Sequence, residues 1–182
     1  HEDKMGIRGT RTSDLIFENV KVPKENLLGK LGGGFKVMMN TLEAGRIGVA
    51  AQAVGVAQSA LDEAIKYTKE RVQFGKTLSK FQNTQFTIAD MATKVEAARL
   101  LVHQAAQLKD NKQSPALLSS MAKYYAAEVA NEVAYKALQL HGGYGFVKDY
   151  RIERIYRDAR ILSIYEGTSQ VQQIVIAGNV LK

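Results

Sequence analysis

One acidic residue near the end of the sequence stands in a setting that suits proton transfer. Glu166 precedes Gly167, follows the apolar residues Ile164 and Tyr165, and stands just before a predicted helix. A carboxyl group held among apolar groups has a raised pKa and becomes a useful base near neutral pH. The alternative is structural, because a helix N-terminus also favours negative charge through its dipole and unpaired N–H groups. For an isolated glutamate the structural interpretation is the default, so the choice depends on the rest of the sequence.

The composition excludes several kinds of site. The chain has 182 residues, of which 46% are hydrophobic, enough for one domain with a buried core. It contains no cysteine, so disulfides, zinc-thiolate sites and a cysteine nucleophile are ruled out. His1, His103 and His141 lack the spacing of metal ligands, and no metal site is predicted. The first residues resemble neither a secretory signal nor a transit peptide, and we expect the chain to be part of a longer protein.

The net charge of +7 raises the possibility of nucleic-acid binding. The basic residues, however, alternate with acidic ones at helical spacing, as in Glu63, Lys66 and Glu70. This pattern is typical of a solvated helix face with i,i+3 and i,i+4 ion pairs. It disfavours nucleic acid as a partner. A modest positive excess suits an anionic small molecule such as a nucleotide equally well.

The chain divides into two parts of different character at a run of three glycines, residues 32–34. Residues 12–23 alternate, are rich in β-forming residues and end at Pro23, which predicts one or two strands. Two short strands cannot fold alone, so we expect them to pair with a sheet outside this sequence or to lie against the helices. The glycine run lacks the motif of a phosphate-binding loop and is interpreted as a hinge. The predicted units are therefore residues 1–31 and 32–182.

The second part carries five helical segments. Apolar residues at three-to-four spacing predict a second long helix after Ser79. Ser114 and Pro115 suit the start of a third, and Gly142 suits its end. The predicted segments are about 35–71, after 79, 114–142, about 151–160 and after 168. Long helices with short connections predict a mainly α fold, an antiparallel four-helix bundle preceded by short strands.

Four segments together resemble the acyl-CoA dehydrogenase family, in particular its C-terminal helical domain preceded by the end of its middle β-domain. They are residues 43–46 (EAGR), 71–75 (RVQFG), 139–145 (QLHGGYG) and 164–170 (IYEGTSQ). Each is weak alone, but their order and spacing make the resemblance specific, and it covers essentially the whole chain. It implies that residues 1–31 end the β-domain and that residues 32–182 form the helical bundle.

The resemblance implies that Glu166 is the general base that removes the α-proton of an acyl-CoA thioester while hydride leaves the β-carbon for FAD. In the family, the backbone N–H of the base and a hydroxyl of FAD bind the thioester oxygen, which stabilises developing charge. Gly167 lets the turn bring its backbone close to the ligand. Some members place the carboxylate on the first helix, and the corresponding position here is Gly45, so the family pattern leaves Glu166 as the base.

The resemblance also assigns binding residues. Those expected to contact FAD, partly across a subunit interface, are Arg71, Phe74, Gln82, Gln139, Gly143, Thr168 and Gln170. Those expected near the acyl-CoA are Glu43, Arg46, Tyr165 and Gly167. Each has an ordinary structural alternative. Arg71 suits a helix C-terminus, Phe74 a core and Thr168 an N-cap, while Glu43 and Arg46 have the spacing of a salt pair.

The function implied by the resemblance is α,β-dehydrogenation of a short-chain acyl-CoA, with FAD as cofactor and electron-transferring flavoprotein as electron acceptor. Family members are dimers of dimers, cytoplasmic in bacteria and in the mitochondrial matrix in eukaryotes. The residues that complete the flavin and acyl pockets are not in this sequence, so we expect the chain alone to be inactive. Two alternatives remain open, a non-catalytic helical oligomerisation module and an acyl-CoA oxidase of the same architecture.

Overall fold

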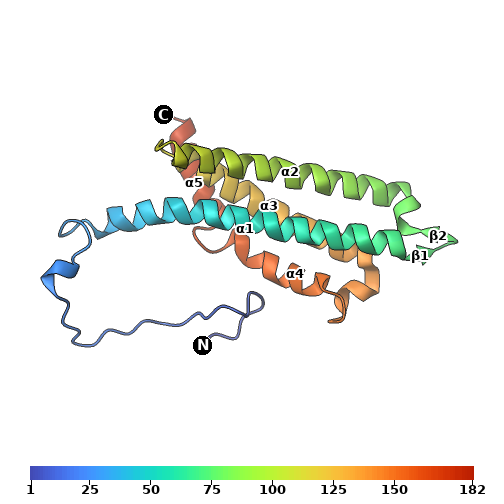
Figure 1. Ribbon diagram of the computed structural model, residues 1–182, viewed down its shortest axis with the longest axis horizontal. Coiled ribbons are helices and arrows are strands. Elements are labelled where there is room, and N and C mark those ends of the chain that lie inside the picture. Colours follow the sequence, from blue (N-terminus) through green and yellow to red (C-terminus); the bar gives the residue numbers. More distant parts are fainter.

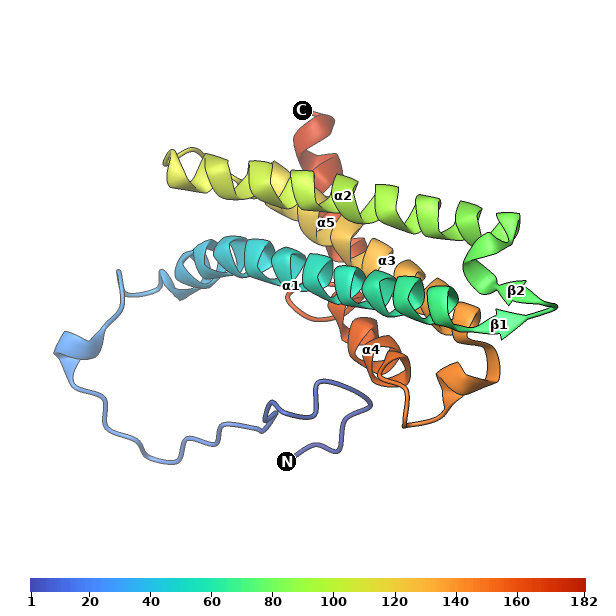
Figure 2. The same ribbon diagram turned by 45° about the vertical axis from the view of Figure 1, so that its right-hand side comes forward.

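The computed structural model describes all residues from 1 to 182, and its body is a layered group of helices (Figure 1). The three long helices are α1 (Gly34–Glu70), α2 (Gln82–Asp110) and α3 (Ala116–His141). Two shorter ones, α4 (Ile152–Ala159) and α5 (Ser169–Val180), follow α3. The predicted mainly helical fold class is confirmed. α5 packs mainly against α3, and Figure 2 shows it crossing the long helices instead of running beside them.

Several helix ends lie at the glycine, proline and capping residues that the sequence predicts, but Ser114, expected as the N-cap of the third helix, makes no cap because Pro115 occupies that position. α3 begins directly after Pro115, which has no N–H to leave unpaired, and ends at Gly142 in a left-handed conformation (φ 59°). At the start of α5, the Thr168 hydroxyl accepts a hydrogen bond from the Val171 N–H (3.3 Å). This cap satisfies one of the free N–H groups of the first turn.

Alanine dominates the core between α1 and α3. Along α1, Ala50, Ala53, Ala57, Ala60 and Ala64 are fully buried, and α3 presents a similar row from Ala122 to Ala137. With no side chain beyond Cβ, these rows let two helix backbones pack closely. Larger apolar side chains fill the core elsewhere, among them Met91 of α2 and Ile152 of α4.

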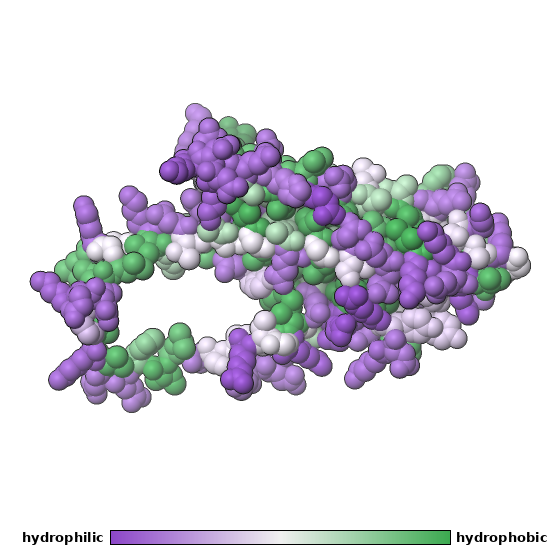
Figure 3. Space-filling model, in the orientation of Figure 1, coloured by the Kyte–Doolittle hydropathy of each residue, from purple (hydrophilic) through white to green (hydrophobic).

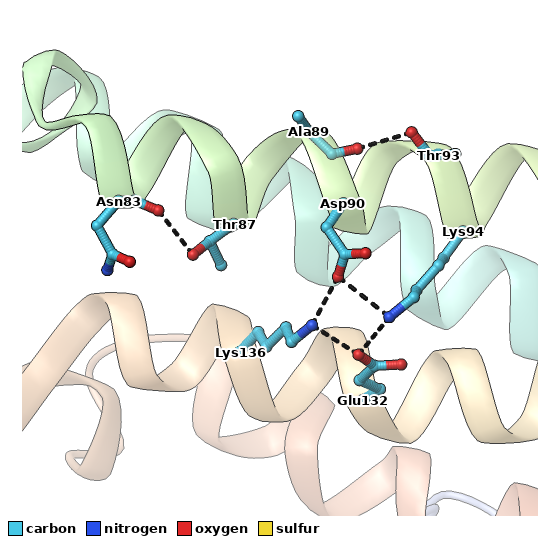
Figure 4. Close-up of polar contacts among 8 residues, drawn as sticks. All are labelled: Asn83, Thr87, Ala89, Asp90, Thr93, Lys94, Glu132 and Lys136. Carbon is cyan, nitrogen blue, oxygen red and sulfur yellow. Dashed lines mark hydrogen bonds and ion pairs between the residues drawn. The ribbon is translucent and has the colours of Figure 1, made fainter.

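Ion pairs join α2 to α3 on the outside of this core (Figure 4). Lys136 reaches Asp90 and Glu132 at 2.6 Å each, and Lys94 reaches Glu132 at 2.6 Å and Asp90 at 3.1 Å. Hydrogen bonds from the two lysines lower the pKa of both carboxyl groups. The helix-face pairs expected around Glu63 do not form, and Glu63 instead lies 3.6 Å from Arg151.

The strands predicted for residues 12–23 do not form. Residues 1–33 run as an extended segment with one short 3-10 turn, Lys24–Asn26. They contact the body near α4, where the Ile7 N–H donates to Asp158 Oδ1 (2.6 Å). A strand is stabilised by its neighbours, and no neighbouring strand lies beside this segment. Its apolar residues, including Leu15, Ile16 and Phe17, are therefore exposed, and Figure 3 shows hydrophobic side chains along it.

The two strands that do form lie between the first two helices, outside the segments predicted to be regular structure. β1 (Val72–Gln73) and β2 (Lys76–Thr77) make a small antiparallel hairpin between α1 and α2. Phe74 and Gly75 form its turn, both with positive φ (51° and 79°). None of the helices combines the length and the apolar composition required to span a bilayer.

Candidate active site

Glu166 lies in a tight turn between a short 3-10 helix (Arg160–Ser163) and α5. Its backbone is left-handed (φ 53°), and Gly167 continues the turn with φ 93°. A positive φ is uncommon for a residue with a side chain and costs on the order of 1–3 kcal/mol. The surrounding contacts must therefore hold this turn in place.

The Glu166 carboxylate lies beside Gly45 of α1. A methyl group placed at Gly45 would come within 2.8 Å of Glu166 Oε2 and 3.3 Å of its Cδ. The fold thus joins two segments that are 121 positions apart in the sequence (166 minus 45). The glycine leaves room for the carboxylate against the helix backbone.

The apolar enclosure expected for Glu166 is not provided by its sequence neighbours. Glu166 is exposed and Ile164 is 44% exposed. Tyr165 is half-buried, its hydroxyl donates to Gln52 Oε1, and burial raises the pKa of its phenol. The amide N–H of Glu166 donates no hydrogen bond within the chain. The turn therefore carries an exposed glutamate whose own amide N–H has no partner within the chain.

The inner side of the turn is held by two side chains that sequence reasoning missed. The Gly167 carbonyl accepts hydrogen bonds from Lys123 Nζ (2.6 Å) and Gln172 Nε2 (3.1 Å). The Gln172 amide also donates to the Glu166 carbonyl (3.3 Å). Both side chains are fully buried. The available signal was the position of Lys123 on the buried stripe of α3, seven residues before Ala130 and three before Ala126.

Arg46 lies inside the bundle rather than on its surface. Only 4% of it is exposed, and its Nη1 donates to Ser120 Oγ of α3 (3.4 Å). No ion pair joins it to Glu43, so the salt-pair alternative is wrong. Its Nε has no partner in the chain. Burying a guanidinium that has an N–H without a hydrogen-bond partner costs free energy and is unusual. The position of Arg46 therefore indicates a role other than that of a surface charge.

Three of the predicted FAD-binding residues line one cavity at the hairpin end of the bundle. Arg71, Gln139 and Gly143 share a cavity of about 460 Å³. Its other lining residues come from the end of α1, the hairpin and the residue after it, the end of α3 and the segment that follows α3: Tyr67, Gln73, Leu78, Leu140, His141, Gly142, Tyr144 and Val147. The Arg71 guanidinium lies 5.2 Å from the centre of the Tyr144 ring. Nothing lies within 4 Å of where a side chain at Gly143 would begin.

Aromatic rings form a wall of this cavity. His141 stacks on Tyr67 with ring centres 4.2 Å apart, and its Nδ1 lies 2.7 Å from the Ala137 carbonyl oxygen. Burial lowers the pKa of His141, which favours the neutral ring. With neutral His141, Arg71 is the one charged side chain that lines the cavity. The cavity therefore combines one cation, one amide, glycine backbone and flat rings.

The other predicted FAD residues lie elsewhere. Phe74 is 91% exposed at the hairpin tip, so the core alternative for it is wrong, and its ring meets that of Phe81 edge-on. Gln82 is exposed at the first position of α2. Thr168 and Gln170 line a second cavity of about 430 Å³ together with Glu128, Asn131, Arg160, Ser163, Ile164 and Ser169. The two cavities share no residue.

Comparison with known proteins finds close relatives. Residues 32–181 match the family described as acyl-CoA dehydrogenase, C-terminal domain. The chain is 61% identical, over its full length, to the caffeyl-CoA reductase-Etf complex subunit CarC of Acetobacterium woodii, of which it covers 48%. It is 54% identical to the mitochondrial short-chain specific acyl-CoA dehydrogenase of Rattus norvegicus, covering 100% of this chain and 44% of that one.

Comparison with a solved structure leads to the same family. The butyryl-CoA dehydrogenase of Megasphaera elsdenii superposes with a TM-score of 0.98 at 50% identity, over 100% of this chain and 47% of that one. The chain spans about half the length of the relatives it matches. It belongs to the acyl-CoA dehydrogenase family, and its residues 32–181 match that family's C-terminal domain.

Proposed function

We propose that this chain supplies the general base of a flavin-dependent acyl-CoA dehydrogenase, and that Glu166 is this base. One observation carries the proposal: a carboxylate on a strained turn lies beside Gly45 of the first helix, and the amide N–H of the same residue has no partner within the chain. An α-proton of a thioester is weakly acidic unless the carbonyl oxygen is stabilised. The Glu166 carboxylate can accept the α-proton, and the backbone N–H of the same residue can stabilise the carbonyl oxygen.

The roles of the chain's own groups follow from this arrangement. The Glu166 carboxylate takes the α-proton, and the Glu166 N–H donates to the thioester oxygen as negative charge develops there. Gly45 and Gly167 keep side chains away from the reacting region. Tyr165, with its hydroxyl held by Gln52, lies next to the base and would contact the acyl chain. Glu43 and Arg46 lie within two residues of Gly45 along α1 and are proposed to border the acyl-CoA site.

The donors in the two cavities fit FAD. A guanidinium, an amide and glycine backbone suit a pyrophosphate, and flat rings suit an adenine. Arg71, Phe74, Gln82, Gln139 and Gly143 would hold one FAD from the hairpin end, and Thr168 and Gln170 would hold one from the start of α5. When bound, the flavin accepts the hydride that leaves the β-carbon.

The separation of the two groups supports assembly from several copies. Five of the seven residues proposed to hold FAD line two cavities that share no residue, and Figure 1 places the hairpin and the start of α5 in different parts of the bundle. In a homo-oligomer, the hairpin end of one copy and the α5 end of another would serve one FAD. We propose a dimer of dimers on this basis.

The relatives support the remaining choices. One is specific for short chains, and another is a subunit of a complex with electron-transferring flavoprotein, as their names state. We propose a short-chain acyl-CoA substrate and electron-transferring flavoprotein as acceptor for the full-length protein. The exposed apolar residues of segment 1–31 favour its assignment to a preceding β-domain that covers them. The helical body would then begin at the glycine run, near residue 32.

A second candidate is the same chemistry run as a reduction, favoured by the reductase name of the 61% identical relative. Glu166 would then donate its proton to the α-carbon of an enoyl-CoA. The residues and their positions are unchanged, because a base in one direction is the acid in the other. Comparing turnover of saturated and α,β-unsaturated acyl-CoA by the full-length protein, with matched oxidised and reduced electron carriers, separates the two directions.

The test of the base is Glu166→Gln in the full-length, flavin-loaded protein. Glutamine keeps the size of the side chain but has no useful proton affinity. We expect acyl-CoA still to bind, while bleaching of the oxidised flavin slows by at least about 10³-fold, within the range attributed to a positioned base. Anaerobic stopped-flow absorbance at saturating substrate measures this rate.

The matched control is Glu96→Gln, the same chemical change on the outer face of α2, where Glu96 pairs only with Arg99. It should bleach at the parent rate. Flavin content should stay near that of the parent in both variants. Bleaching by the Glu166 variant within about tenfold of the parent rate, far less than the effect of a lost base, would show that Glu166 is not the base.

A further inference from the structure

We propose that Lys123 is a positioning residue, which fixes the Glu166–Gly167 turn by holding the Gly167 carbonyl from inside the bundle. The proposal rests on the assignment of Glu166 as the base. It adds a residue from α3 that touches neither substrate nor cofactor, and acts on the reaction through the backbone of the turn.

The contact is short, and its donor is a buried lysine. Lys123 is fully buried, and its Nζ donates to the Gly167 oxygen at 2.6 Å. This is the one hydrogen bond that its ammonium group makes within the chain. A buried lysine is rare unless it is paired. Its placement against one backbone carbonyl therefore calls for an explanation beyond packing.

Charges around the ammonium oppose the penalty of burial. Burial lowers the pKa of Lys123, while the negative charges of Glu128 and Glu166 act in the opposite direction and the positive charge of Arg46 reinforces the lowering. Glu128 is itself engaged, because it accepts a hydrogen bond from the Ser169 hydroxyl at 2.5 Å. Ser169 is the first residue of α5, so α3 also holds the helix that follows the turn.

The turn needs such a support because its backbone is unfavourable. Glu166 has a positive φ (53°), which is strained for a residue with a side chain, and strained residues persist only where neighbours over-determine them. Gly167 adopts its own positive φ without such a cost. Gln172 supplies the second support, with its amide on the carbonyls of Glu166 and Gly167. The packing there leaves no spare room, since a methyl group at Gly167 would lie 2.5 Å from Gln172 Nε2.

The two carbonyls lie on the peptide units directly after Glu166 and Gly167, next to the Cα atom that carries the reactive carboxylate. Hydrogen bonds to these carbonyls limit the movement of the backbone from which the Glu166 side chain extends. Lys123 therefore sets where the proton acceptor lies relative to α1. Small displacements of a reacting group, of about 1 Å, can slow a reaction about 10²-fold.

The experiment uses Lys123→Met in the full-length flavoprotein, because methionine fills a similar volume without a donor. Hydrogen–deuterium exchange of the segment 164–172 is the first readout, and it does not depend on activity. We expect exchange there to accelerate by about tenfold or more, the size expected for losing a hydrogen bond from a charged group. Bleaching of the flavin at saturating acyl-CoA should slow by about 10- to 100-fold, with substrate affinity little changed.

Met91→Ala is the matched control. Met91 is fully buried in the core, and no hydrogen bond joins its side chain to the turn. It should lower thermal stability while leaving exchange of segment 164–172 and the bleaching rate at parent values. Gln172→Leu removes the second support and should act in the same direction as Lys123→Met. If Lys123→Met does not fold, Gln172→Leu tests whether buried hydrogen bonds to the turn control its exchange and the bleaching rate.

Each outcome has a defined meaning. Exchange of segment 164–172 at the parent rate in Lys123→Met overturns the proposal, whatever the activity. Faster exchange with an unchanged bleaching rate shows a structural anchor and overturns the positioning role. If the parent itself does not bleach with any acyl-CoA, the proposed function fails, and the exchange readout still decides whether Lys123 holds the turn.

Discussion

The cavity beside Arg71 and the turn of Glu166 are built in opposite ways. The cavity is wide, lined by rings and glycine backbone, and carries a single charged side chain at the end of a helix. The turn is narrow, strained, and held from behind by buried polar side chains. Binding a large ligand tolerates small adjustments, whereas proton transfer needs a reacting atom within a few tenths of an ångström. The buried hydrogen-bond donors lie behind the turn, the part of the molecule in which the position of the reacting atom controls the rate.

The largest effect is expected from a variant that displaces the Glu166 carboxylate while the fold stays intact. In Gly45→Ala the new methyl group would meet only the flexible end of Glu166, 2.8 Å away. We expect flavin bleaching to slow by about 10- to 100-fold, because the carboxylate must move by a few tenths of an ångström or more. Stability should stay level or rise by up to about 1 kcal/mol, because alanine favours helix over glycine.

Gly48→Ala is the control for that variant. It lies in the same helix, three residues on, and a methyl group there meets nothing within 4 Å. It should gain similar stability and bleach at the parent rate. Stopped-flow absorbance and thermal unfolding on both variants measure the two quantities. Equal bleaching rates for the two variants would mean that the carboxylate does not occupy this place during the reaction.

The cavity is tested by removing its cation. Arg71→Ala in the full-length protein should weaken FAD binding by about 10- to 100-fold, since a charge-assisted hydrogen bond to phosphate contributes roughly 1.5–3 kcal/mol. Fluorescence titration of the apoprotein with FAD measures the dissociation constant. Lys69→Ala removes a neighbouring cation in the last turn of α1 that does not line this cavity. It should leave FAD affinity unchanged, and equal losses in both variants would point to a general effect of helix-end charge.

The smallest effect concerns the aromatic wall. Burial holds the folded pKa of His141 below its unfolded value, so the ring contributes full stability above the unfolded pKa, about 6.5. As pH falls below that value, the unfolded chain binds a proton that the folded chain does not, and stability is lost until the lowered folded pKa is reached. His141→Phe keeps the ring but cannot titrate. Thermal unfolding between pH 7.5 and 5.0 should show a smaller decline for this variant, and parallel declines would contradict the assignment.

Much of the fold was predictable because its signals are local. α1 was expected over about 35–71 and runs over Gly34–Glu70, and α3 ends at Gly142 as expected. Glycine and proline act on their own backbone, so the sequence alone locates these ends. The strands expected at residues 12–23 are absent because a strand depends on a partner, which the local pattern does not supply.

The site was predictable in part for the same reason. Glu166, Arg71 and Gln139 belong to recognisable segments, and the structure puts Arg71 and Gln139 in one cavity. Lys123 was missed because its role comes from a contact across the bundle, 44 positions from Gly167. Gln172 lies only 5 positions away, but its contact depends on how the turn folds back onto the first turn of α5. A lysine on a buried stripe was the one visible sign, and it does not say which carbonyl the lysine would meet.

The alanine rows between α1 and α3 reverse the usual direction of mutational tolerance. Most cores are weakened when large side chains are cut back, because cavities remain. Here fully buried alanines make much of the contact. Almost any substitution of one of them therefore adds side-chain atoms to the core instead of removing them. Added methyl groups would push the two helices apart, and overpacking of this kind typically costs about 1–3 kcal/mol. Because α1 bears Gly45 and α3 bears Lys123, drift toward larger residues along this seam would shift the two walls between which the Glu166 turn is held.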